Sequence, residues 1–276
     1  MSEGEAGGSG KKRQPVVFLP HGGGPCFFMD WTWGPADTWE KTRAFLEGLA
    51  GTLPERPRAL LVVSGHWEER AFTAGTAAQP ELIFDYSGFP EHTYRLTWPA
   101  PGDPELAREV ERLLREAGLP SGLDGSRGYD HGVFVPLKVA FPEAEIPVVT
   151  LSLERGLDPA LHLAAGRALA SLREKGVLIV GSGMSFHNLR GFMHPETPGR
   201  SAEFDQWLTA AVEAPQAERD GLLARWAQAP FARYAHPREE HLLPLMVAAG
   251  AAGADRGERV FHDTPMMAAT SAYRFG

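Results

Sequence analysis

Histidine is the residue type in this chain whose placement indicates chemistry. A neutral imidazole binds borderline divalent metals, and its pKa near neutrality also suits proton transfer. A single loop histidine is more often a solvated or packing group than a ligand, but several at strand ends are harder to explain that way. Five of the ten histidines lie where an apolar run ends or where a helical stretch begins: His21, His66, His131, His187 and His241. The pattern predicts a site built from histidines on separate segments.

Glycines stand directly beside His21 in HGGGP at 21–25 and beside His66 in SGH at 64–66. A glycine lets the backbone approach a metal or a substrate closely and adopts φ values that other residues avoid. Either run is also consistent with a simple tight turn.

Familiar local motifs of other enzyme classes are missing. The sequence contains no HExxH, no CxxC, no GxSxG, no Walker loop and no GxGxxG after a strand. Ser185, close to His187, leaves a serine hydrolase as a weakly supported alternative. The residues alone therefore point to metal chemistry by scattered histidines, without naming the reaction.

The elements that must position these residues alternate along the chain. Near-continuous apolar runs, typical of strands covered on both faces, occur at 15–19, 59–65, 146–153 and 177–183. Helices are predicted at 36–50, 104–117, 158–174, 200–228 with a break near Ala214 and Pro215, and 238–249. This alternation predicts an α/β fold with a central, mostly parallel or mixed sheet flanked by helices. Ligands of such sheets bind beyond the carboxyl ends of the strands, so His21, His66 and His187 are expected to converge there.

Length and composition set the outer limits. Residues 15–276 are expected to form one catalytic domain, and residues 1–14, rich in Gly, Ser and charge, a disordered tail. The formal net charge of -8, with both signs interspersed, argues against nucleic acid as a partner. The lone Cys26 cannot form an intramolecular disulfide, and no N-terminal apolar stretch resembles a signal peptide or a membrane span. We therefore expect a cytoplasmic protein without a membrane partner.

Seven segments, each weak alone, occur in an order that identifies a family. They are LPHGGGP at 19–25, SGHWEE at 64–69, DYSGFPEHTY at 85–94 followed by PAPG at 99–102, RGYDHGVFVPL at 127–137, GSGMSFHNL at 181–189, HPREEHLLPLMVAAGAA at 236–252, and SAYRFG at the end. Together they resemble the class III, LigB-like extradiol ring-cleaving dioxygenases, and within them the DOPA 4,5-dioxygenase-like branch. The resemblance covers nearly the whole chain.

The resemblance implies roles for the five histidines. His21 and His66 match the first two metal ligands of the family, and His241 stands where the ring-cleaving subunit of protocatechuate 4,5-dioxygenase has a glutamate. His187 resembles the general acid/base of the family, and His131 resembles the histidine that contacts a substrate oxygen. Whether His187 also touches the metal stays open at this point.

The implied reaction is the opening of a catechol ring by O2, an oxidoreductase chemistry that inserts both oxygen atoms. Fe(II) is expected for turnover, and Zn(II) is an expected occupant of the purified protein, since three imidazoles suit either ion. Asp130 is a candidate to fix the tautomer of His131. Aromatic side chains next to the motifs either stack on the substrate ring or pack the core: Phe27, Phe28, Trp67 and Phe134.

Two other functions compete with this interpretation. A zinc hydrolase or lyase could use the same histidines with a metal-bound water as nucleophile. The Memo-type proteins, which resemble this fold, suggest a binding protein with a relict metal site. Neither the catechol nor the oligomeric state is indicated by the sequence.

Overall fold

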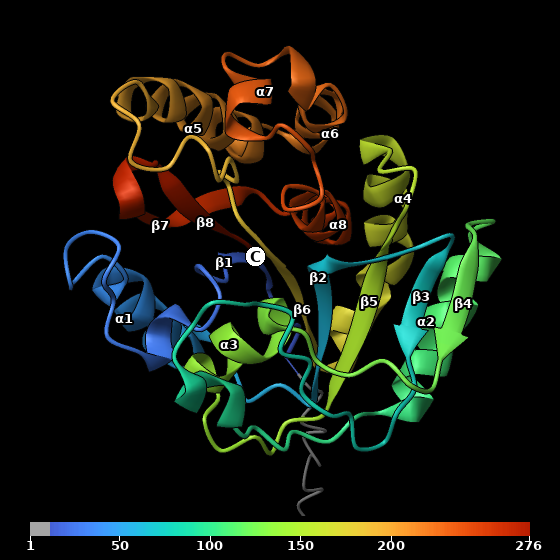
Figure 1. Cartoon of the computed structure of the whole chain (residues 1–276). Helices are drawn as coiled ribbons and strands as arrows, with labels where there is room; N and C mark the ends of the chain where they lie inside the picture. The colour runs from blue at the N-terminus through green and yellow to red at the C-terminus, as the bar shows by residue number, and fades with distance from the viewer. Residues whose placement is uncertain (1–11) are drawn as a thin grey trace, which may run out of the picture.

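The computed structural model describes residues 12–276, which form one eight-stranded mixed sheet with helices on both faces (Figure 1). The strands, in sheet order, are β4 (Ser121–Asp124), β3 (Phe72–Gly75), β5 (Val148–Glu154), β2 (Ala59–Glu69), β6 (Val177–Gly183), β1 (Val16–Pro20), β8 (Thr270–Phe275) and β7 (Gly257–Asp263). The central strands β5, β2, β6 and β1 are parallel, β4 is parallel to β3, and the other neighbours are antiparallel. The predicted α/β fold is confirmed.

The four central strands are the four apolar runs of the sequence. Successive side chains of β2 point to opposite faces, so Leu61 and Val63 enter one core and Leu60 and Val62 enter the other. A strand buried on both faces is apolar at nearly every position, which is why these four strands could be predicted from the sequence.

Helices cover the two faces unequally. On one face lie α1 (Glu40–Gly48) and α3 (His131–Ala140). The other helices pack with the larger core: α2 (Pro104–Glu116), α4 (Pro159–Leu169), α5 (Thr197–Glu213), α6 (Gln216–Ala224), α7 (Ala232–Ala235) and α8 (Leu243–Ala252). Short 3-10 helices occupy Cys26–Phe28, Leu49–Thr52, Glu91–Arg95, Ala170–Lys175, Trp226–Gln228 and Pro265–Met267. No helix among residues 12–276 has both the length and the apolar character needed to cross a bilayer.

Helix α8 is fixed by close contact with α4. A Cβ at Gly166 of α4 would lie 2.1 Å from the carbonyl oxygen of Val247, and a Cβ at Gly250 of α8 would lie 2.1 Å from that of Leu163. The two backbones therefore touch where neither helix has a side chain. Every residue of α8 is buried, so the segment that precedes it is held on a rigid support.

The helix predicted at 238–249 begins later than expected. It starts at Leu243, with Pro244 in its first turn, where proline is favoured because its N–H is not needed. A helix already formed at Arg238 would bring the Pro244 ring against the carbonyl of Glu240. His241 consequently lies in the turn before α8 and not in its first turn.

Helix α3 was not predicted, and Pro136 inside it has a structural consequence. Proline has no N–H to donate to the carbonyl four residues earlier, which belongs to Gly132. That carbonyl instead accepts a hydrogen bond from the hydroxyl of Ser182 in β6. The side chain of Ser182 thereby ties α3 to the central sheet.

Residues 1–11 of the expected tail lie outside the described residues. At its other end Gln14 is fully buried, its backbone N–H donates to Arg173 O at 3.2 Å, and its Nε2 donates to Glu55 O at 3.2 Å. The ordered chain therefore begins before Pro15, because Gln14 has hydrogen-bond partners in the fold.

Candidate metal centre

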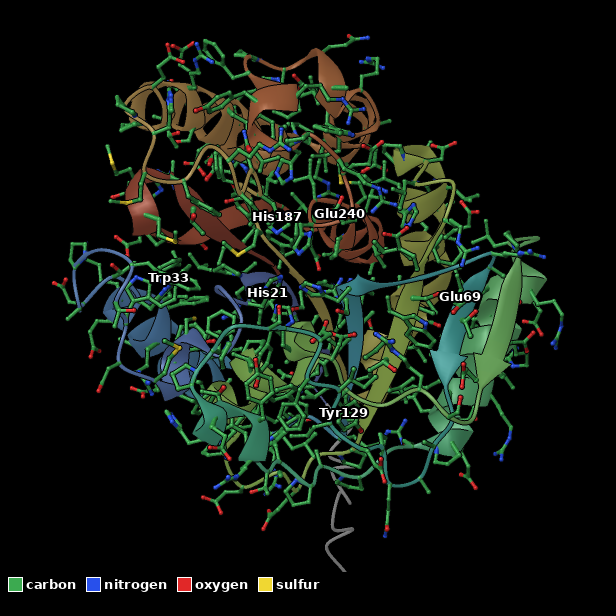
Figure 2. All side chains as sticks on the ribbon, viewed as in Figure 1. His21, Trp33, Glu69, Tyr129, His187 and Glu240 are labelled. Atoms are coloured by element: carbon green, nitrogen blue, oxygen red, sulfur yellow. The ribbon has the colours of Figure 1, made fainter. Side chains whose placement is uncertain are left out.

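The central strands bring three histidines to one edge of the sheet. His21 directly follows β1, His66 lies near the end of β2, and His187 lies shortly after β6. These strands are parallel neighbours, so their carboxyl ends meet at this edge. The ring centroids of His21 and His66 lie 4.9 Å apart, and Figure 2 labels His21 and His187 in this central region.

Two helices bring further histidines to the same edge, one from each face of the sheet. His131 is the first residue of α3, and His241 lies just before α8. Gly183 makes room for the second, because a Cβ there would lie 2.1 Å from the carbonyl oxygen of His241. Ring centroids are 4.0 Å apart for His66 and His131 and 3.3 Å apart for His187 and His241. All five histidines singled out in the sequence are therefore brought together.

Glycines after His21 adopt the backbone conformations that the sequence suggested. Gly22 has a φ of +84° and Gly24 a φ of +55°, in the left-handed region. A Cβ at Gly24 would also lie 2.8 Å from the ring of Phe89. The HGGGP run is thus a tight turn, and the absence of a side chain at Gly24 leaves room for the ring of Phe89 close to His21.

Three imidazole nitrogens face one another. The Nε2 of His66 lies 3.3 Å from the Nε2 of His21 and 3.2 Å from the Nε2 of His241. His21 and His241 each direct Nδ1 to an oxygen at 2.9 Å, that of Gly22 O and Glu240 Oε1 respectively, so Nδ1 carries the proton and Nε2 presents a lone pair.

This arrangement fits a divalent metal. Nitrogens about 2.1 Å from one ion are about 3.0 Å apart at a right angle and about 3.4 Å apart at a tetrahedral angle. The Nε2 separations of 3.2 and 3.3 Å lie between these values. Lone pairs that face each other without an intervening proton repel, and a cation between them removes the repulsion.

Burial keeps these imidazoles neutral. Burial and, to a smaller extent, neighbouring His131 lower the pKa of His66 to about 3, although Asp85 acts in the opposite direction. Burial likewise lowers the pKa of His21 and of His241 well below the usual value. Neutral imidazole is the form that binds a metal.

His131 and His187 also lie close to these three histidines, so the distances alone allow more than one set of three metal ligands. Ligand atoms of His21, His66 and His131 lie within 4.8 Å of one another, and so do those of His187, Glu240 and His241. The ring of His187 is parallel to that of His241 within 16°.

A carboxylate that sequence reasoning did not assign orients His131. Asp85 Oδ1 accepts from the His131 backbone N–H at 3.0 Å and from its Nδ1 at 2.8 Å. Burial acts to raise the pKa of Asp85, but the hydrogen bond and charge of His131 lower it to about 2. Asp85 lies in the DYSGFPEHTY motif, which was the available signal.

The expectation that Asp130 fixes the His131 tautomer is wrong. Asp130 Oδ1 accepts from the Ser64 hydroxyl at 2.7 Å, and Oδ2 accepts from the Arg127 guanidinium at 2.8 Å. The carboxylate of Asp130 is thus paired with Ser64 of β2 and with Arg127, and the Nδ1 of His131 pairs with Asp85 instead.

Glu240 is a second carboxylate that the sequence did not single out as part of the site. Its Oε1 lies 2.9 Å from His241 Nδ1 and 3.4 Å from His187 Nδ1, and Figure 2 shows Glu240 beside His187. Burial acts to raise the pKa of Glu240, but the hydrogen bond from His187, together with a backbone hydrogen bond and the nearby charges of His187 and Arg238, lowers it below the usual value. One carboxylate thus orients two of the histidines.

A cavity of about 310 Å³ opens onto the histidines. His21, His66, His131 and His187 line it. Its other walls are largely apolar and comprise Gly22, Gly23, Gly24, Trp31, Trp33, Trp39, Phe89, Met184, Leu189, Phe192 and Met266. We call this space the ring cavity.

The aromatic residues proposed from the sequence do not line the ring cavity. Phe27, Trp67 and Phe134 are buried, and Phe28 packs against the core. The packing alternative is therefore correct for all four. No sequence pattern marked the tryptophans that do line the cavity, because they lie in the segment between β1 and α1 and do not directly follow a strand.

Ser185 has no catalytic geometry. It is buried, its hydroxyl accepts a hydrogen bond from Ser271 N–H at 2.8 Å, and its carbonyl pairs with His236 Nε2 at 2.9 Å. The serine hydrolase alternative has no support at this residue.

Comparison with known proteins decides the family. The family model described as the catalytic LigB subunit of aromatic ring-opening dioxygenase matches residues 15–275. The chain belongs to this family. It is 38% identical over 271 residues to dioxygenase tasH of Hapsidospora irregularis, covering 90% of this chain and 81% of that protein.

Other members of the LigB family are named for a specific reaction. The chain is 38% identical over 233 residues to 4,5-DOPA dioxygenase extradiol of Beta vulgaris, covering 83% of this chain and 86% of that protein. The protein of the same name in Escherichia coli K12 is 34% identical over 243 residues, which cover 87% of this chain and 85% of that protein. A crystal structure of an uncharacterized protein from Escherichia coli K12 superposes with a TM-score of 0.75 at 28% identity, covering 96% of this chain and all of that chain.

As a LigB family member, this chain is a non-haem extradiol ring-cleaving dioxygenase. Its histidine cluster is compatible with the metal site that such an enzyme requires. The enzymatic interpretation is confirmed, and the alternatives of a hydrolase or of a non-catalytic binding protein are not supported.

Proposed function

We propose that the enzyme opens the ring of a catechol with O2 beside the two hydroxyls, using Fe(II) held by Nε2 of His21, His66 and His241. The observation that carries the proposal is the approach of these three nitrogens from three different segments, with His21 and His66 lining the ring cavity.

Ring orientation supports His241 over His187 as the third ligand. A metal lies close to the plane of the imidazole that binds it. The two rings are nearly parallel and their centroids are 3.3 Å apart, so one ion cannot lie in both planes. Since His241 Nε2 faces His66 Nε2 at 3.2 Å, we assign the ligand role to His241 and leave His187 free.

His21, His66 and His241 would hold Fe(II), which would lower the pKa of the catechol hydroxyls and supply the redox chemistry with O2. His187 lines the ring cavity, and Glu240 directs its Nδ1, which leaves Nε2 to take a proton from a catechol hydroxyl and later return it. Asp85 holds the Nδ1 proton of His131, so the Nε2 of His131 is available to accept a hydrogen bond from a substrate oxygen.

The proposed ligands suit more than one metal, so the ion in the protein depends on which metal is supplied. Three neutral imidazoles leave the ion its full charge and also suit zinc. We therefore expect Zn(II) in protein purified without precautions and Fe(II) in the active enzyme.

The test compares one protein preparation in two metal states. Metal-free protein is reconstituted anaerobically with Fe(II) or with Zn(II), and each is mixed with a panel of catechols while O2 uptake and the yellow ring-opened product are recorded. We expect one O2 consumed per ring opened with Fe(II) and none with Zn(II). Product formed with Zn(II) but without O2 uptake would instead support a hydrolase or lyase.

We further propose that the partners are a small aromatic diol and O2, with no nucleic acid or membrane, and that the enzyme works in the cytoplasm. The net charge of -8 supports the first part. The second is supported by the single cysteine, Cys26, because a chain with one cysteine has no intramolecular disulfide of the kind common in oxidising compartments.

A further inference from the structure

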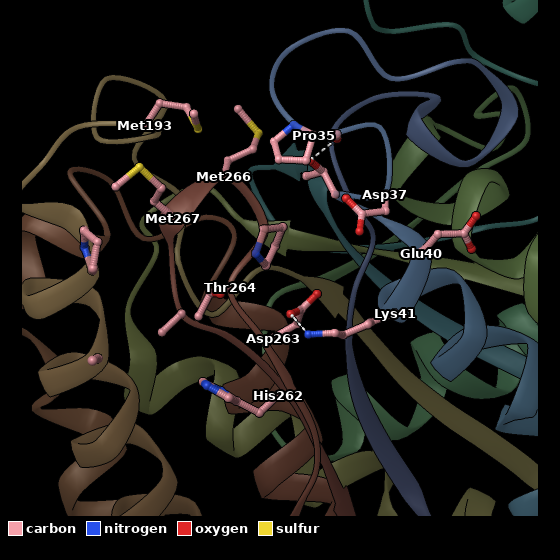
Figure 3. Close-up of a pocket in the computed structure, with 15 residues that line it drawn as sticks. Pro35, Asp37, Glu40, Lys41, Met193, His262, Asp263, Thr264, Met266 and Met267 are labelled. Carbon is pink, nitrogen blue, oxygen red and sulfur yellow. Dashed lines mark hydrogen bonds and ion pairs between the residues drawn. The ribbon is translucent and has the colours of Figure 1, made fainter.

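A second cavity adjoins the ring cavity. It measures about 540 Å³, and Met266 lines both spaces. Trp31 and Trp33 lie on the ring cavity, and the chain continues from them to Pro35 and Asp37, which line the second cavity. Residues 31–37 thus contribute to both spaces, and Met266 lies beside Pro35 in Figure 3. Figure 3 shows Met266 among the residues that line the second cavity. We call this space the arm cavity.

The ring cavity offers no cation for a substrate carboxylate. Among the described residues that line it there is no lysine and no arginine. Two arginines near the histidines are already paired, Arg127 with Asp130 at 2.8 Å and Arg238 with Glu68. A carboxylate in this space would lose its water without gaining a lysine or arginine as a partner, which is unfavourable.

The arm cavity combines methionines with acidic groups. Its apolar lining comes from Met193, Met266 and Met267 together with prolines, and Figure 3 shows the three methionines at one end. Flexible thioether side chains adapt to apolar groups of varied shape.

The charged lining of the arm cavity is predominantly negative. Asp37, Glu40 and Asp263 contribute carboxylates, while Lys41 Nζ lies 3.1 Å from Asp263 Oδ1. The remaining basic group, His262, lies 3.4 Å from Asp205. A carboxylate that reached this cavity would be repelled, whereas an apolar chain would meet methionine and proline.

We propose that the substrate is a catechol with an apolar ring substituent that carries no carboxylate, and that this substituent passes Met266 into the arm cavity. The proposal rests on the proposed ring-cleaving function. It adds the substrate class and the place where the substituent binds.

The first test compares matched substrates on Fe(II)-loaded enzyme. The substrates are 4-methylcatechol, 4-hexylcatechol and the 4-hexylcatechol analogue whose terminal methyl is replaced by a carboxylate. We expect kcat/KM for 4-hexylcatechol to exceed that of its carboxylate analogue at least tenfold. Equal or better use of the carboxylate analogue would overturn the proposal. If even 4-methylcatechol is not cleaved, the proposed function itself fails.

The second test locates the substituent. Ala202 is exposed on α5 and lines the arm cavity but not the ring cavity, so Ala202→Phe narrows only the former. We expect kcat/KM to fall about tenfold for 4-hexylcatechol and less than twofold for 4-methylcatechol. The control is Glu203→Phe at the adjacent exposed position, which lines neither cavity and should change neither value. Equal effects of Ala202→Phe on both substrates, or none on either, would contradict the assignment.

A binding measurement makes the result independent of turnover. The tryptophans of the ring cavity report catechol binding to the Zn(II)-loaded protein through their fluorescence. Ala202→Phe should weaken binding of 4-hexylcatechol about tenfold and leave 4-methylcatechol unchanged, whereas no selective change would contradict the proposal. Arg190, exposed beside Leu189 at the ring cavity, supplies a further check. If Arg190→Gln selectively abolished turnover of the carboxylate analogue, a carboxylate site would exist and the proposal would fail.

Discussion

At the scale of single residues, the proposed assignment gives metal binding to His241 and proton transfer to its stacked neighbour His187. Glu240 holds Nδ1 of both rings through one oxygen, yet only His241 directs Nε2 toward His66. The pair therefore provides two imidazoles of the same chemistry in two roles, distinguished only by the direction of the second nitrogen.

The separation predicts the phenotype of His187→Gln. The variant should keep its metal and its affinity for catechol, because the proposed ligands are untouched, while turnover falls about 10²- to 10⁴-fold through loss of a general acid/base. Metal stoichiometry and turnover are measured on the same preparation. Metal lost in proportion to activity would show that His187 is a ligand, and undiminished turnover would remove it from the mechanism.

His241 should behave differently. His241→Ala removes a proposed ligand and should abolish metal retention after gel filtration, whereas His241→Glu supplies a carboxylate and should restore part of it. The assignment fails if His241→Ala binds one equivalent of metal as tightly as the wild-type protein. Circular dichroism serves as the control for folding, since His241 is buried.

At the scale of elements, the strands that could be predicted were those whose apolar pattern follows directly from burial on both faces of the sheet. The runs at 59–65 and 177–183 are apolar because both faces of β2 and β6 are covered. The strands β3 and β4 have four residues each, and β7 is mostly exposed, so burial imposed little pattern on them. Helix α3 was missed because all of its residues except Lys138 are buried, which hides the helical period, and because Pro136 lowers the helix propensity.

The candidate site divides in the same way. The five histidines could be found from the sequence because strand ends and a recognisable motif order mark them. The motifs contain Asp85 and Glu240 but do not indicate their roles, because Asp85 contacts His131 and Glu240 contacts His187, each on another segment. The walls of the ring cavity come from loops whose path is set by tertiary contacts, so no local pattern predicts them.

The close packing of β6 against the segment before α8 predicts the effect of Gly183→Ala. The added Cβ would meet the His241 carbonyl oxygen at 2.1 Å, so that segment must move away. We expect lower stability by about 1 to 3 kcal/mol, as for overpacking elsewhere, and weakened metal binding. Gly199→Ala in α5, where a Cβ meets nothing within 4 Å, is the matched control and should be neutral or slightly stabilising. Unfolding in urea and metal titration measure the two effects, and an unaltered metal affinity in Gly183→Ala would argue against this packing.

At the scale of the whole molecule, Arg173 joins distant parts of the chain. Its buried guanidinium donates to Gln14 O at 2.8 Å, to the carbonyls of Ala251 and Ala252 at 3.2 Å, and to Asp255 Oδ2 at 2.6 Å. The start of the sheet, the end of α8 and the approach to β7 are therefore fixed by one side chain.

This junction predicts a pH-dependent contribution of Asp255 to stability. Burial acts to raise the pKa of Asp255, but hydrogen bonds from Arg173 and Arg13 lower it below its usual value. A lowered folded-state pKa stabilises the fold above the unfolded-state pKa of about 3.9, and the contribution is lost as pH falls toward the folded-state value. Asp255→Asn should therefore cost about 1 to 3 kcal/mol at pH 7 and less at pH 3.

Urea unfolding of metal-free protein at both pH values checks this prediction. Glu145→Gln is the control, because Glu145 pairs with Arg56 where both side chains are more than half exposed, and it should change stability little at either pH. A cost for Asp255→Asn that did not vary with pH would show that the carboxylate charge is not responsible.

The antiparallel pairing of β1 with β8 places Val16 opposite Phe275, so the two ends of the described chain lie next to each other. A peptide of a few residues should therefore join Gly276 to Lys12 without disturbing the sheet, and the resulting circle could be reopened at the exposed Gly118, where a Cβ would meet nothing within 4 Å. Such a circular permutant would begin near β4 and carry the histidines in a rotated order. Because each is held by its own strand end or helix start, the rearranged chain should still assemble the same metal centre.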